Sequence, residues 1–110
     1  MAVQSVAISN SNTDLFLSTG NNAVTTIMIC NTIPFDPLDP TADQTYLYLH
    51  IVANGDGVTN TNLVVNKLLV PAGETVTFDT EKIILANGDR IVANTELPAN
   101  LVATTSTLSI

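Results

Sequence analysis

Charged residues are scarce in this sequence, and positive ones are the scarcest. Only 12% of the 110 residues are charged, against about 25% in an ordinary soluble domain. The cations are Lys67, Lys82 and Arg90, and the net charge is −7. Because no basic stripe is available to neutralise phosphates, we expect no nucleic-acid partner. The same charge disfavours an anionic membrane surface.

Long hydrophobic runs are also missing. No apolar stretch reaches the roughly 18 residues of a membrane-spanning helix. The first residues, Met1-Ala2-Val3-Gln4-Ser5-Val6, contain neither the basic segment nor the apolar core of a secretory signal. We therefore expect no membrane association.

Histidine and cysteine occur once each, which limits the chemistry that one copy of the chain can do. A Ser–His–Asp relay would depend on His50, and no G-x-S-x-G segment accompanies it. A zinc site needs several Cys and His ligands, and Cys30 has no second cysteine for a disulfide. We predict that the protein is not an enzyme and that it needs no cofactor or metal, with Cys30 a small buried hydrophobic residue.

Two polar loops contain the hard oxygen ligands that calcium prefers. Asp36, Asp39 and Asp43 lie in one, and Asn54, Asp56 and Asn60 lie in the other. Neither loop has the twelve-residue EF-hand spacing. We interpret both as solvated turns, and the sequence leaves calcium binding undecided.

Threonine and asparagine are abundant where charge is absent, and threonine favours a pleated surface. Short segments rich in Val, Ile, Thr and Leu alternate with turns such as Asn54-Gly55-Asp56-Gly57 and Asn87-Gly88-Asp89. No stretch shows a sustained helical apolar stripe. The pattern predicts one all-β domain over residues 1–110, an antiparallel β-sandwich of eight or nine strands, either immunoglobulin-like or jelly-roll. The expected strands are Val3–Ser9, Leu15–Ser18, Ala23–Asn31, Thr45–Ala53, Leu63–Val70, Glu74–Asp79, Lys82–Leu85, Arg90–Thr95 and Leu101–Ile110.

Strict alternation assigns two faces to the strand at Thr45–Ala53, because side chains two residues apart share a side. Leu47, Leu49 and Ile51 then face the core. The other face presents Tyr46, Tyr48, His50 and Val52. Since tyrosine is favoured at protein interfaces, we predict that this second face contacts another subunit.

A second candidate interface is the loop from Thr32 to Asp43, which has a proline at every third position. This spacing matches the three-residue turn of polyproline II, so we expect a stiff, extended loop. The loop is either a surface connection between the sheets or a contact whose apolar anchors lie along a neighbouring subunit. The residues concerned are Pro34, Phe35, Pro37 and Leu38.

The second half of the chain resembles small β-sandwich virion proteins of tailed bacteriophages, particularly those of aquatic and cyanobacterial hosts. The matching features are the V-P-A-G turn at residues 70–73, the L-x-x-G-D-x-I hairpin at residues 85–91 and the Thr/Ser-rich segment at residues 101–110. The resemblance implies a structural protein in the virion, either capsid decoration (cement) or a head, neck or tail component. It supplies no catalytic residue.

We therefore expect a capsid decoration protein that stabilises a particle through subunit contacts. Its expected partners are the major capsid protein, other virion proteins and further copies of itself. The alternatives are a head–neck or tail accessory protein, and a receptor- or glycan-binding module in which Tyr46 and Tyr48 form an aromatic platform.

Overall fold

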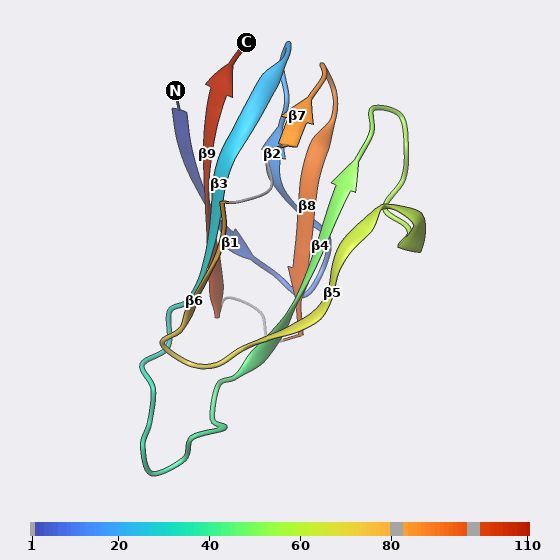
Figure 1. Cartoon of the computed structure of the whole chain (residues 1–110). Helices are drawn as coiled ribbons and strands as arrows, with labels where there is room; N and C mark the ends of the chain where they lie inside the picture. The colour runs from blue at the N-terminus through green and yellow to red at the C-terminus, as the bar shows by residue number, and fades with distance from the viewer. Residues whose placement is uncertain (1, 80–82, 97–99) are drawn as a thin grey trace.

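The computed structural model describes residues 2–79, 83–96 and 100–110, which form two antiparallel sheets packed face to face (Figure 1). The five-stranded sheet has the order β1 (Ala2–Ile8), β9 (Leu101–Ser109), β3 (Asn22–Asn31) and β6 (Thr75–Phe78), with β7 (Ile83–Leu85) also paired to β3. The four-stranded sheet has the order β2 (Thr13–Leu17), β8 (Arg90–Thr95), β4 (Thr45–Val52) and β5 (Leu63–Val70).

The prediction of an all-β sandwich is confirmed. Nine strands lie within the described residues, where the helical content is a 3₁₀ turn, η1 (Asn60–Asn62). No helix in these ranges is long and apolar enough to cross a bilayer. Thr59 is the N-cap of η1 and stabilises this turn, because it exchanges hydrogen bonds with Asn62.

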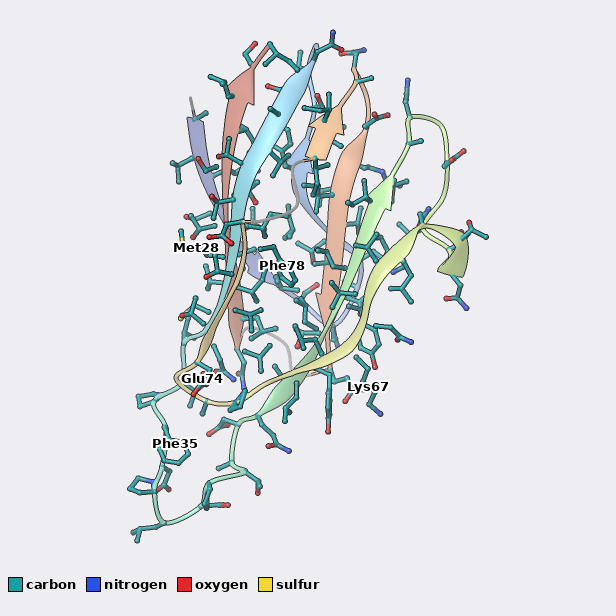
Figure 2. The ribbon with its side chains drawn as sticks, viewed as in Figure 1. Met28, Phe35, Lys67, Glu74 and Phe78 are labelled. Carbon is teal, nitrogen blue, oxygen red and sulfur yellow. The ribbon has the colours of Figure 1, made fainter. Side chains whose placement is uncertain are left out.

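The core fills the space between the sheets with side chains from alternate positions of each strand. Ile27 and Ile29 from β3 face Leu47 and Leu49 from β4, and all four are at most 2% exposed. Each fully buried aliphatic side chain stabilises the fold by about 1.5–3 kcal/mol. Val76 and Phe78 pack against this core from β6, as the alternation predicts. Figure 2 shows Phe78 between the two sheets.

The proline loop, residues 32–43, projects from one end of the sandwich (Figure 1). The prediction of a uniformly extended polyproline conformation is wrong in its second half. Asp39 N donates to Asp36 O at 3.1 Å, and Ala42 N donates to Asp39 O at 3.0 Å. Each Asp is followed by a proline, which favours the second position of a β-turn. Two successive turns therefore replace the extended chain.

Candidate functional site

The most distinctive surface is the outside of the five-stranded sheet, which we call the outer sheet face. Its side chains point away from the core, as Met28 does in Figure 2. The strand registers place on it Val3, Ser5, Ala7, Ala23, Thr26, Met28, Cys30, Thr75, Thr77, Ile84, Val102, Thr104, Ser106 and Leu108. Every one of these residues is uncharged.

Register aligns these side chains in rows across the sheet. Ser5 pairs with Thr104, which pairs with Met28, which in turn pairs with Thr77. Cross-strand neighbours on one face have Cβ atoms about 4.5–5.5 Å apart. One row therefore presents three hydroxyl groups and a thioether. The face combines hydroxyl and methyl groups throughout.

Apolar atoms on this face are open to solvent. Val3 is 68% exposed, Ile84 61%, Leu108 42% and Met28 40%. Three adjacent strands, β1, β9 and β3, contain no charged residue in their combined length. These three strands are therefore uncharged in a chain whose net charge is −7. Contiguous uncharged surface of this kind is typical of the centre of a protein–protein interface, where charged residues are depleted.

The predicted tyrosine face lies on the four-stranded sheet, and its tyrosines are engaged within the chain. The ammonium group of Lys67 lies 5.0 Å from the centre of the Tyr46 ring, within the range of a cation–π contact. Tyr48 donates from its hydroxyl to Glu96 Oε1 at 2.9 Å. This hydrogen bond raises the pKa of Tyr48 above 10.0, and desolvation and the charge of Glu96 act in the same direction. Both rings are half-buried.

The prediction that His50 and Val52 are available on that face is wrong. They are on the side that the alternation assigns, but His50 is 7% exposed and Val52 is 0% exposed. Residues 53–62 fold back over this part of the sheet. His50 Nδ1 lies 2.8 Å from Asn62 Oδ1, and Arg90 Nη2 donates to the carbonyl of Asp56 at 3.4 Å. His50 is therefore bonded to this loop, and neither His50 nor Val52 offers an exposed side chain for an interface.

The proline loop does expose its predicted residues. Leu38 is 95% exposed and Phe35 51% exposed, and Pro34 and Pro37 are also exposed. The base of the loop is fixed by Asn31, which donates to the carbonyls of Asp43 at 2.9 Å and Val70 at 3.1 Å. The loop is a second protruding apolar element, at the end of the molecule near Glu74 (Figure 2).

Neither polar loop forms a metal centre in the part of the chain that the structure describes, where no three His, Cys, Asp or Glu side chains cluster suitably. Asp36 Oδ1 instead accepts from Leu38 N at 2.9 Å. The loop after β4 encloses a polar hollow of about 260 Å³ with no aromatic wall. The hollow itself therefore offers no stacking platform for a sugar ring, and Tyr46 and Tyr48 are not among its lining residues.

The sheets separate slightly where β5 faces β6 and β7, leaving a cleft of about 390 Å³. Its lining is entirely apolar: Ile27, Leu49, Ile51, Val64, Val65, Phe78 and Ile83. A ligand site normally adds a few polar groups that fix the orientation of the ligand. The lining residues offer none, so we assign no chemistry to this cleft.

Cys30 differs from its prediction. It is half-buried on the outer sheet face rather than enclosed in the core, because its register partners Val102 and Thr75 share that side. His50 lies on the other sheet. The thiol and the imidazole are therefore not brought together as a nucleophile and a base.

The outer sheet face was missed at the sequence level, although a signal exists. Residues 101–109 alternate, with Leu101, Ala103, Thr105 and Thr107 buried and the intervening positions more accessible. The uncharged accessible half of this strand could have been identified. Its position beside β1 and β3 could not, because strand order is not written in the sequence.

Comparison with known proteins finds no matching family model, no matching curated protein and no matching solved structure. The surfaces described above are therefore the basis for assigning a role.

Proposed function

We propose that this chain is a structural virion protein of a tailed bacteriophage, a capsid decoration protein that docks on the shell through its outer sheet face. The single observation that supports this most is that the paired strand residues on the outer sheet face carry no charge, although the protein is acidic. The resemblance of roughly residues 45–110 to small virion sandwiches agrees with it. The partner is a capsid surface of similar uncharged, hydroxyl- and methyl-rich character.

The free-energy cost of desolvation favours docking through an uncharged face. Docking an ionised side chain requires the removal of its hydration shell, at a cost of several kcal/mol unless the charge is well paired. Desolvation of the hydroxyl groups of Ser and Thr costs less free energy, and these groups can form hydrogen bonds with a partner. Burial of Met28, Ile84 and Leu108 supplies about 25 cal/mol for each Å² of apolar surface removed from water.

The proline loop gives a second contact in this proposal. Phe35 and Leu38 are exposed on the loop that projects from one end of the sandwich (Figure 1), and they would engage an adjacent capsid subunit. Two separate contacts on one shell raise the overall affinity through their effective concentration. The tyrosines on the opposite sheet then face away from the shell, and His50 and Val52 do not participate.

The test is cosedimentation of the purified chain with empty shells of the major capsid protein of the same virus. Wild type should bind in a stoichiometric and saturable manner. Met28→Lys, which places a charge on the outer sheet face, should weaken binding at least tenfold. Leu17→Lys is the matched control, because Leu17 is 56% exposed but lies on the other sheet.

Equal binding of wild type and Met28→Lys would contradict docking through this face. Absence of wild-type binding to the shells would contradict a decoration role. Binding to a glycan array, abolished by a calcium chelator, would favour the receptor-binding alternative instead.

A further inference from the structure

We propose that β1 is a pairing edge for a second copy of this chain, which adds its own β1 in antiparallel orientation across a twofold axis. The two five-stranded sheets then become one continuous sheet. The inference deepens the proposed function, on which it rests, because pairing places two outer sheet faces side by side on the shell.

The edges of the two sheets differ in how they are protected from pairing with another strand. An edge strand has a row of unpaired backbone N–H and C=O groups, and natural proteins usually block it with charge, proline, bulges or short length. β1 is the edge next to β9. It pairs in unbroken register from Ala2 to Ile8 and contains no charge, no proline and no bulge.

The other edges carry the blocking features. On β5, Lys67 has a φ of 56° and the ladder with β4 shifts register twice. On β2, the register shifts after Asp14, whose carboxylate is paired with Arg90 at 3.1 Å. The edge opposite β1 is divided between β6 and β7, which have four and three residues. Among the described strands, β1 therefore stands apart as a long, regular and unblocked edge.

The exposure of the β1 side chains agrees with a free pairing edge. Ala2, Val3, Gln4 and Ser5 are all exposed, whereas Ile8 is fully buried at the far end of the strand. The free part of the edge is thus the first half of β1, which lies at the outside of the sheet in Figure 1.

A second copy is the occupant that the charges favour. Two acidic chains repel one another, but neither β1 nor its neighbour β9 carries a charge, and like charges are screened beyond about 10 Å at 0.1 M salt. Two β1 strands related by a twofold axis place only uncharged side chains opposite each other. Most homo-oligomers close with this symmetry.

The area of one outer sheet face also favours a pair of copies. The ten residues of β3 give a length of about 33 Å, and four strands about 4.8 Å apart give a width of about 19 Å. One outer sheet face therefore covers roughly 600 Å², less than the about 800 Å² per partner of a standard interface. Two faces joined through β1 exceed that value.

The first test is amide hydrogen exchange of the intact wild-type chain over a dilution series in free solution. In the monomer, alternate amides of residues 2–5 point away from β9 and exchange rapidly. At high concentration these amides should exchange at least tenfold more slowly. A dimer in which they stay unprotected, or a chain that stays monomeric at millimolar concentration, would overturn the inference.

Two lysine variants separate this edge from the docking face. Gln4→Lys adds charge to the side of β1 opposite the outer sheet face, so it should raise the dimer dissociation constant at least tenfold and weaken shell binding only through lost avidity. Met28→Lys should leave the dimer intact and weaken docking. If Met28→Lys dissociates the dimer while Gln4→Lys does not, the copies pair through their faces and the inference fails. A wild-type chain that forms the β1 dimer but does not bind the shells refutes the proposed function alone.

Discussion

The hydroxyl groups of Thr45 and Thr95 lie 2.7 Å apart in the interior of the sandwich, joining β4 to β8 at a position where both residues are at most 2% exposed. Thr105 on β9 is equally buried, but its hydroxyl has no hydrogen-bond partner within the described residues. A buried hydroxyl gains its stability from its partner and costs free energy without one.

These two threonines predict opposite results for the same substitution. Thr95→Val should lower the free energy of unfolding by about 1–2 kcal/mol, because it removes a buried hydrogen bond. Thr105→Val should raise it by about 1 kcal/mol, because it removes an unsatisfied hydroxyl at nearly constant volume. Urea denaturation measures both. A loss of stability in Thr105→Val would mean that its hydroxyl is satisfied in solution.

The Tyr48–Glu96 hydrogen bond predicts a shifted titration. In a Tyr46→Phe background, Tyr48 should ionise above pH 10.0, and Glu96→Ala should return its pKa towards that value. The folded state holds the Tyr48 proton more tightly than the unfolded state does. The hydrogen bond therefore contributes stability below pH 10.0, and this contribution is lost as the pH rises through the pKa of Tyr48 in the folded state. Tyrosinate absorbance follows the ionisation. Glu74→Ala, on a different turn, is the control and should leave the curve unchanged.

Asn31 predicts the stability of the base of the proline loop. Its side chain is 1% exposed, donates to Asp43 and Val70, and accepts from Ile33 N at 3.2 Å. Asn31→Ala should lower the free energy of unfolding by about 2 kcal/mol, since buried partners lose their hydrogen bonds. The exposed Asn21→Ala should change it by less than about 0.5 kcal/mol. Equal effects in thermal unfolding would contradict a role for Asn31 as the anchor.

We expect the hydrogen bonds of Asn62 to hold the loop that follows β4. The side-chain oxygen of Asn62 lies 2.8 Å from His50 Nδ1 and accepts from Thr59 N at 3.2 Å. Its side-chain nitrogen donates to the carbonyl of Gly57 at 2.8 Å. Asn62→Ala should destabilise the protein by about 1–2 kcal/mol and increase amide exchange across residues 53–62. Asn60→Ala, an exposed neighbour in η1, should have neither effect. Unchanged exchange in Asn62→Ala would show that other contacts hold the loop.

The sequence predicts the strands well, because the alternation between Val/Ile/Thr segments and Asn/Gly turns is a local property. The predicted strand at Arg90–Thr95 has the observed bounds, and the turns at Asn54–Gly57 and Asn87–Asp89 separate strands as expected. The proline loop was misread although its signal is local: Asp36-Pro37 and Asp39-Pro40 each begin a turn, and the three-residue proline spacing concealed this.

The candidate interfaces depend on contacts between segments that are distant in the chain, which a local sequence pattern does not show. Alternation placed Val52 and His50 on the correct side of β4, but it could not show that both are buried there, or that Asn62 from the following loop bonds His50. Likewise, the outer sheet face exists because β1, β9 and β3, distant in the chain, are neighbours in one sheet. A pattern within one strand shows which side chains share a side and leaves open what covers that side.

The proline loop has a practical consequence. Its two turns close on themselves and its base is held by Asn31, while Leu38 at the tip is almost fully solvated. Exposed loop tips of this kind tolerate inserted sequence without loss of the fold. A foreign peptide spliced in at Leu38 should leave the nine strands undisturbed, so the loop is a site for peptide insertion.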